Sequence, residues 1–362
     1  MNARRHAELL CGWCLDVQAG DQVLVRTTSL ATPLVLALQA EILAREAWPL
    51  LRVAVPGQEE GFHAGARDVH LDTVASSALV EVEHADAFLA IQAPENTRAL
   101  AGVDPDRLVR MRRAQAPLLE ARMRKRWCQT IWPTPALAQD AGMGTEEYAA
   151  FLERALFLDR EDPVAAWREL GARQAALIER LTPASELRIE AEGTDLTLRV
   201  AGRTWVNSDG RRNMPSGEVF TGPHEDATEG VVTFDVPTGP AGVDVAGVRL
   251  ELRAGEVVHA SAERGEEYLH RALATDPGAR RLGELGIGTN HGIDRPTGTI
   301  LLDEKIGGTI HLALGRSYPE TGGRNESALH WDLILDLRGG GRLRADGEMV
   351  AENGELVGRP MS

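Results

Sequence analysis

The pattern of apolar residues changes once along the chain, near Thr182, and this change constrains the fold more than any other feature. Before it, short apolar runs of the buried-strand type alternate with helical patterns. These runs lie at residues 22–26, 50–55, 87–91 and 127–131. After residue 187, alternating strands are separated by glycine-rich turns, and Asn353-Gly354 predicts a closing hairpin. The two halves of the chain therefore have different architectures.

We predict an α/β N-terminal domain with a mostly parallel sheet, because strands that alternate with helices form βαβ units. A β-rich α+β domain follows it. The predicted domains span residues 1–182 and 183–362, and the length of 362 residues is ordinary for two domains. A chain of this size can bury a large core without a disulfide or a metal.

Charge and hydropathy exclude several classes of protein. The formal net charge is -15, which argues against a general nucleic-acid binder because phosphate contacts need basic surface. No stretch approaches the 18 apolar residues or more of a membrane-spanning helix, so no membrane partner is predicted. The first residues carry two arginines without an apolar segment behind them. A cytoplasmic protein is therefore expected.

Cys11 and Cys14 form a C-x-x-C motif. Redox pairs of this type lie at a helix N-terminus after a strand, where the thiol pKa is lowered. Here the pair lies inside a predicted helix and precedes the first strand, and a second C-x-x-C that would complete a zinc site is lacking. The spacing favours two small apolar residues on one helix face over a redox protein.

Carboxylates and histidines recur in the second half of the chain. His330 and Asp332 are two residues apart in a predicted strand, so both side chains point to one face. They could therefore converge on one metal ion, and imidazole with carboxylate suits Zn, Co or Mn. Spacing alone leaves open that these histidines are ordinary core residues.

Four strings in this half resemble the thermophilic metallo-aminopeptidase family of the aminopeptidase T, aminopeptidase S and PepS type. They are PSGEVFT at 215–221, GIGTN at 286–290, DEKIGGTIHLALG at 303–315 and HWD at 330–332. A weaker resemblance covers residues 133–143 and 146–148. The order of the strings and the long gaps between them also fit, so the resemblance covers most of the chain.

The resemblance implies a homodimeric exopeptidase that removes N-terminal residues from peptides with a free N-terminus. It implies two divalent ions of Zn, Co, Mn or Mg, about 3.5–4 Å apart, that share a water molecule. The metal ligands carried over by motif position are five residues: Glu218, Glu284, His311, His330 and Asp332. All five positions, and that of the site tyrosine Tyr318, hold the expected residue type, which favours an active enzyme.

Within this resemblance, Glu284 is expected to bridge the two ions. Tyr318 would donate a hydrogen bond to the tetrahedral oxyanion or contact a metal directly. Glu304 is a candidate for proton transfer, and the alternative is a structural ion pair between Glu304 and Lys305. Two other functions remain open: a different metal-dependent amidohydrolase on the same scaffold, and a non-catalytic peptide-binding dimer.

Overall fold

The computed structural model of the protein describes residues 1–239 and 243–358, and these form two compact units. The first unit contains residues 1–164 and 210–215, and the second contains residues 165–209 and the chain from Ser216 onward. The helical pattern at residues 163–181 lies before the predicted boundary and so falls in the predicted first domain, whereas the contacts place nearly all of this helix in the second unit. The boundary at residue 182 stays a prediction about domains.

The first unit is built on a five-stranded parallel sheet, sheet A, with strand order β2-β1-β3-β4-β8. Its strands are β1 (Gln22–Thr28), β2 (Trp48–Ala54), β3 (Ala87–Gln92), β4 (Arg126–Ile131) and β8 (Asn213–Met214). Buried apolar runs such as that of β1 are typical of parallel strands covered on both faces. The predicted parallel sheet is therefore confirmed.

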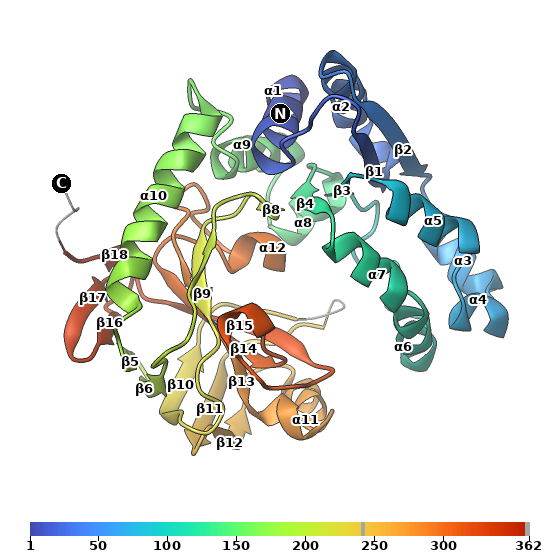
Figure 1. The fold of residues 1–362 in the computed structure, drawn as a ribbon. Helices are drawn as coiled ribbons and strands as arrows, with labels where there is room; N and C mark the ends of the chain where they lie inside the picture. Colours follow the sequence, from blue (N-terminus) through green and yellow to red (C-terminus); the bar gives the residue numbers. More distant parts are fainter. Residues whose placement is uncertain (240–242, 359–362) are drawn as a thin grey trace. The chain divides into compact units, whose positions relative to one another are not determined.

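Nine α-helices surround sheet A in the described part of this unit (Figure 1). They are α1 (Ala3–Leu9), α2 (Thr32–Ala44), α3 (Gln58–Gly65), α4 (Asp68–Asp72), α5 (Ser76–His84), α6 (Pro105–Ala114), α7 (Ala116–Met123), α8 (Pro135–Asp140) and α9 (Thr145–Ala155). A π-helical turn, Leu10–Cys14, extends α1, and a 3-10 turn, Ser29–Ala31, precedes α2. Leu24 and Phe88 of the sheet pack with Val82 of α5 and Ala121 of α7.

The helical pattern at about 104–124 predicts a single helix, and this prediction is wrong in one respect, because the structure divides the segment into α6 and α7 at Gln115. Pro117 accounts for the break. Proline has no N–H for the helix ladder, and its ring clashes with the carbonyl four residues earlier. The side chain is tolerated in the first turn of a new helix, which is where the structure places it.

The second unit contains two antiparallel sheets and the long helix α10 (Pro163–Leu181). Sheet B has the order β12-β11-β10-β6-β5-β16-β17-β18, and sheet C has the order β15-β14-β13-β9-β7. The strands of sheet B are β5 (Glu186–Ala191), β6 (Thr194–Arg199), β10 (Glu229–Phe234), β11 (Val248–Arg253), β12 (Glu256–Ser261), β16 (Arg342–Ala345), β17 (Glu348–Glu352) and β18 (Glu355–Leu356). The predicted Asn353-Gly354 hairpin joins β17 to β18, and both turn residues have positive φ.

Sheet C is the smaller sheet, and short helices accompany it. Its strands are β7 (Val206–Ser208), β9 (Glu218–Thr221), β13 (Leu282–Gly288), β14 (Thr309–Gly315) and β15 (His330–Asp336). The helical segments of this part are α11 (Glu266–Leu273), α12 (Ile300–Asp303) and two 3-10 turns, Pro277–Arg280 and Pro319–Thr321. The β-rich second half of the chain is therefore confirmed.

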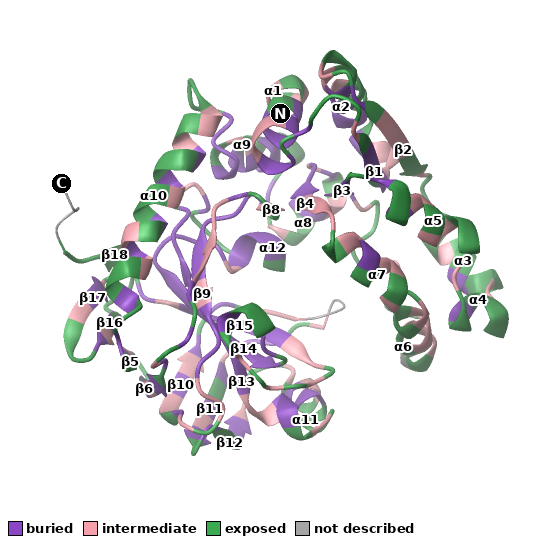
Figure 2. Ribbon diagram, viewed as in Figure 1, coloured by how far each residue is buried: buried purple, intermediate pink, exposed green. Residues whose placement is uncertain are grey.

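The two faces of sheet C have different chemistry because side chains alternate along each strand. Leu285, Leu312 and Leu333 point into a core that they share with leucines and valines of sheet B. The residues one position away carry carboxylates and imidazoles instead. Figure 2 shows how strongly β13 and β14 are buried, and every residue of both strands is classed as buried. The apolar core thus fixes the register that holds the polar face in place.

No helix among the described residues is long and apolar enough to cross a membrane.

Leu24→Ala is expected to lower the free energy of unfolding of the first unit by about 2–5 kcal/mol, because the side chain is fully buried in β1. Urea denaturation measures the change. Leu36→Ala is the matched control, since Leu36 is 60% exposed on α2, and its effect should stay within about 0.5 kcal/mol. Equal losses in the two variants would contradict the packing described for β1.

Candidate metal centre

Five predicted ligands lie on one face of sheet C, and the strand register brings them together. Glu284 of β13 pairs with Ala313 of β14, which in turn pairs with Asp332 of β15. In the neighbouring row, Gly286 pairs with His311. Small residues therefore separate the donor side chains across the sheet and leave room between them.

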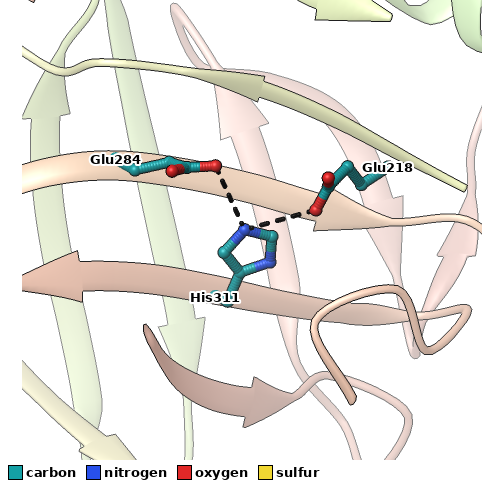
Figure 3. A group of neighbouring side chains, drawn as sticks. All are labelled: Glu218, Glu284 and His311. Atoms are coloured by element: carbon teal, nitrogen blue, oxygen red, sulfur yellow. Dashed lines mark ion pairs between the residues drawn. The ribbon is translucent and has the colours of Figure 1, made fainter. Parts of the chain in front are cut away.

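The first cluster of donors contains Glu218, Glu284 and His311. In Figure 3 the His311 ring lies between the two carboxylates. His311 Nε2 is 3.5 Å from Glu218 Oε2 and 3.5 Å from Glu284 Oε1. All three side chains are buried. These distances exceed ordinary hydrogen bonds, and they leave space for an ion that each donor atom contacts.

The second cluster contains Glu284, His330 and Asp332. His330 Nε2 is 3.5 Å from Glu284 Oε2 and 3.7 Å from Asp332 Oδ1. The other ring nitrogen of His330 lies 2.9 Å from the carbonyl oxygen of Arg316. A hydrogen bond of this type orients a metal-binding histidine and leaves its second nitrogen for the metal. Glu284 therefore offers one carboxylate oxygen to each cluster.

Several metal-ligand atoms of these side chains lack hydrogen-bond partners, which fits a bound metal. Glu218 Oε2, Asp332 Oδ1 and both ring nitrogens of His311 are buried and have no hydrogen-bond partner among the described residues. Buried polar atoms normally have a hydrogen-bond partner. Several buried ligand atoms without a partner in the same place therefore indicate that another group binds there. Carboxylate oxygen with imidazole nitrogen is a donor set that divalent transition metals accept. The residues present therefore fit the metal that the sequence implied.

The ionisation of the cluster also favours positive charge. Burial raises the pKa of Glu218 and of Glu284 above the usual range. Burial, together with the charge of Glu304, raises the pKa of Asp332 to about 6. Burial by itself would lower the pKa of His311, yet the Glu284 and Glu218 carboxylates raise it to about 9. Added positive charge therefore stabilises this group of buried carboxylates. A divalent cation supplies two such charges, whereas a proton supplies one.

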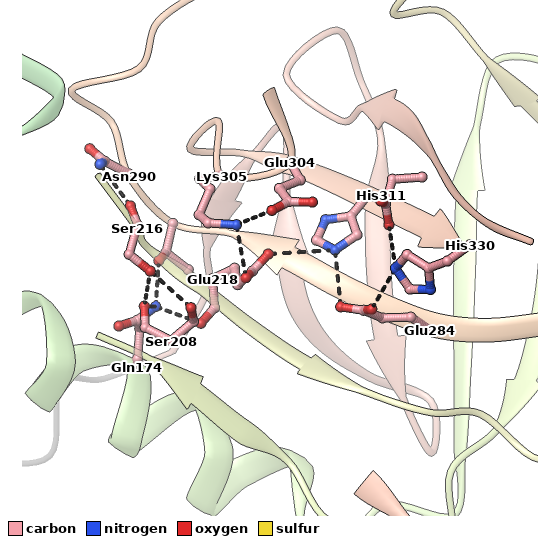
Figure 4. Close-up of polar contacts among 12 residues, drawn as sticks. Gln174, Ser208, Ser216, Glu218, Glu284, Asn290, Glu304, Lys305, His311 and His330 are labelled. Atoms are coloured by element: carbon pink, nitrogen blue, oxygen red, sulfur yellow. Dashed lines mark hydrogen bonds and ion pairs between the residues drawn. The ribbon is translucent and has the colours of Figure 1, made fainter. Parts of the chain in front are cut away.

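The sequence left open whether Glu304 transfers protons or forms a structural ion pair with Lys305, and the position of Glu304 allows both. Lys305 is fully buried, and its ammonium contacts the Glu304 carboxylate and lies 3.0 Å from Glu218 Oε1 (Figure 4). The ion pair between Glu304 and Lys305 is thus present. A Glu304 oxygen also lies in a third cluster with His311 and Asp332. The structure places Glu304 beside the predicted ligands, and its part in proton transfer stays a prediction.

Tyr318 also lies at the site. Its ring centroid is 5.2 Å from that of His330 and 5.8 Å from that of Phe220. Burial and the negative charges around it raise the pKa of the Tyr318 hydroxyl, so the hydroxyl keeps its proton and can donate it in a hydrogen bond. The structure therefore brings all seven predicted site residues into one region of the second unit.

Lys305 and Gly286 are features that the sequence analysis did not assign to the site. A Cβ built on Gly286 would lie 2.0 Å from Cε1 of His311, so only glycine leaves space for this ring. The sequence around Gly286 gives no sign of this contact, since the contact depends on the pairing of β13 with β14. The signal for Lys305 was its position beside Glu304, but its contact with Glu218 spans 87 residues.

The C-x-x-C motif belongs to the first unit, whereas the candidate metal ligands belong to the second. Cys11 and Cys14 are buried in the π-helical turn, and neither forms a disulfide. Burial raises the pKa of Cys11 to about 12, so its thiol is not activated for redox chemistry. This agrees with the apolar-face interpretation made from the spacing.

Comparison with known proteins identifies the family. Residues 1–355 match the family described as thermophilic metalloprotease (M29). The chain belongs to this family. Aminopeptidase 2 of Geobacillus stearothermophilus is 35% identical over 306 residues, which cover 73% of each chain. Aminopeptidase T of Thermus aquaticus is 32% identical over 332 residues, which cover 80% of each chain. The resemblance drawn from the motifs is therefore confirmed, and the chain is a member of a peptidase family.

Solved structures confirm the fold class. Wild-type AmpT from Thermus thermophilus matches with a TM-score of 0.85 and 27% identity, covering 98% of both chains. A 2,5-dihydroxypyridine dioxygenase from Pseudomonas putida KT2440 matches with a TM-score of 0.61 and 17% identity, covering 99% of this chain and 96% of the other. The second likeness concerns the fold alone. Since a dioxygenase shares this fold, membership of the M29 family and not the architecture identifies a peptidase.

Gly286→Ala is expected to weaken metal binding at least tenfold, because the added methyl group displaces the His311 ring by which the first cluster is completed. A loss of about 1.4 kcal/mol of binding free energy corresponds to that factor. Equilibrium dialysis with Zn²⁺ or Co²⁺ measures the affinity. Gly339→Ala is the control, since a Cβ there meets nothing within 4 Å. Wild-type affinity in the Gly286 variant would exclude His311 from the metal centre.

Proposed function

We propose that the protein is a metal-dependent aminopeptidase that releases N-terminal residues from peptides by means of two divalent metal ions. Family membership supports a metal-dependent peptidase, and the curated relatives are named as aminopeptidases. The observation that carries the two-ion part is the position of Glu284, whose Oε1 faces His311 and whose Oε2 faces His330. One carboxylate shared between two donor clusters is the arrangement expected of a bridging ligand.

In this proposal the residues divide into two sets that share Glu284. Glu218, Glu284 and His311 would hold one ion, and Glu284, His330 and Asp332 would hold the other. Bound divalent metals lower the pKa of water and polarise a carbonyl group, which is the chemistry that peptide hydrolysis requires. Zn, Co, Mn and Mg all remain candidates, since the oxygen and nitrogen donors admit each of them.

Two further side chains would move or hold protons. The Glu304 carboxylate faces His311 and Asp332 on one side and Lys305 on the other. Burial by itself would raise the pKa of Glu304, yet the positive charge of Lys305 lowers it. The Glu304 carboxylate is therefore ionised and able to accept a proton from the attacking water. Tyr318 keeps its proton and would donate a hydrogen bond to the oxyanion of the tetrahedral intermediate.

The two alternative functions make different demands. Another metal-dependent amidohydrolase would use the same ligands, so substrate profiles separate it from an aminopeptidase. A non-catalytic peptide-binding dimer is not favoured, because every predicted ligand is present and lies in one of two donor clusters that share Glu284. The homodimer implied by the motif resemblance and the cytoplasmic location expected from the sequence pattern stay part of the proposal. Sedimentation of the purified protein and fractionation of cells would measure them.

A free α-amine on the substrate is expected to be essential, because capture of that amine confines cleavage to the terminal residue. Acetylation removes the positive charge and the lone pair that such a site uses. The comparison is Leu-anilide against acetyl-Leu-anilide, measured after chelation and again after Co, Zn, Mn or Mg is restored singly. Activity that returns with metal on the free-amine substrate alone supports the proposal. Comparable rates on both substrates would indicate an endopeptidase or general amidase.

Glu284→Gln is expected to lower kcat by at least on the order of a hundredfold, because an amide cannot neutralise two cations as a carboxylate does. Steady-state kinetics with saturating metal measures the loss, and circular dichroism tests that the fold is retained. Glu267→Gln is the matched control, since its side chain is 87% exposed on α11. Near-normal turnover in the Glu284 variant would remove the two-metal assignment.

A further inference from the structure

A cavity of about 290 Å³ lies within the second unit, directly beside the second donor cluster. His330, Asp332 and Ile334 line it from one face of β15, because they occupy alternate positions of the strand. Ile300 and Asp303 of α12 line it as well, together with Pro237. The volume is close to the lower end of pockets that hold small organic ligands.

Apart from the donor cluster, Asp303 and Thr238, the side chains that line this cavity are apolar. Ile300, Ile334 and Pro237 form its apolar walls. Among the described residues that line it, the ionisable side chains are His330 and Asp332 of the donor cluster, and Asp303. No lysine or arginine is among them, so an acidic group would find no counter-ion there.

Asp303 does not present a free charge to the cavity. Its Oδ1 accepts hydrogen bonds from the backbone N–H and the hydroxyl of Thr297, both at 2.8 Å, and its Oδ2 accepts one from the Gly298 N–H at 2.8 Å. The side chain is almost completely buried. Asp303 is thus committed to holding the loop before α12, and a basic ligand group would have to compete with three existing hydrogen bonds.

We propose that this cavity holds the side chain of the substrate's N-terminal residue and selects an uncharged, apolar one. The inference rests on the proposed function, since it takes the reacting end of the substrate to lie at His330, Asp332 and Glu284. A peptide whose first carbonyl lies at this cluster carries the side chain of its first residue on the carbon next to that carbonyl group. The cavity that shares His330 and Asp332 with the cluster is therefore within its reach.

The first test is a substrate series on the metal-restored protein: Leu-, Ala-, Lys- and Asp-anilides with free amines. Leu-anilide should exceed Ala-anilide in kcat/KM by at least about tenfold, since a single methylene in an apolar pocket is worth roughly 10- to 200-fold. It should also exceed both charged substrates. A preference for Lys- or Asp-anilide over Leu-anilide would overturn the proposal.

The second test changes the charge of the cavity wall. Ile300→Asp is expected to raise kcat/KM for Lys-anilide relative to Leu-anilide by roughly tenfold, because the new carboxylate attracts the ammonium group of the substrate. Ile300→Lys is expected to raise the same ratio for Asp-anilide similarly. A general structural defect would move both ratios in the same direction. Ile300 is 44% exposed, so either charge can be hydrated in the folded protein.

Val258→Asp and Val258→Lys are the matched controls. Val258 is 48% exposed on β12, does not line the cavity, and gives the same change in net charge. Its variants should keep the wild-type substrate ratios. Unchanged ratios in the Ile300 variants, or equal shifts in both pairs, would overturn the subsite while the aminopeptidase proposal stands. Failure to hydrolyse any free-amine substrate would remove both.

Discussion

Three carboxylates, those of Glu218, Glu284 and Asp332, lie buried on one face of sheet C, and the half-buried Glu304 carboxylate at the end of α12 lies beside them. The mutual repulsion of these four groups is the constraint around which the site is organised. Removing several charges of one sign from water is expensive unless they are paired. Lys305 offsets part of this charge from one side. The remaining unpaired oxygen atoms and the two histidines provide a place for divalent metal, whose positive charge would offset the rest of the negative charge.

The rest of the second unit holds these charged side chains in fixed positions. The donor side chains stand on antiparallel strands whose other face packs into an apolar core with sheet B. A slip of one residue in β14 would bury His311 in that core and expose leucines to the metal centre, so the core itself enforces the register. Glycine and alanine in the neighbouring positions leave the space that the donors and a metal occupy.

The architecture and the chemistry are separable in this protein. A dioxygenase shares the fold at low identity, whereas the match to the metalloprotease family extends over residues 1–355. The scaffold therefore supplies a rigid polar face on a sheet, and the identity of the side chains on that face determines the reaction. The cavity beside β15 extends this division, because its apolar walls lie outside the donor clusters and can vary without removing a ligand.

The sequence by itself determined the two kinds of architecture, four of the five strands of the parallel sheet and the family, and it predicted a set of candidate metal ligands. Each of these depends on local periodicity or on short strings, such as the alternation that places His330 and Asp332 on one face. The helical pattern continues across Pro117, so the sequence predicted one helix where the proline divides it into two. Only the tertiary structure decided which donors share Glu284, that Gly286 makes room for His311, and that Lys305 pairs with Glu218. The physical reason is that strand pairing and packing join residues distant in sequence, and no local pattern records those contacts.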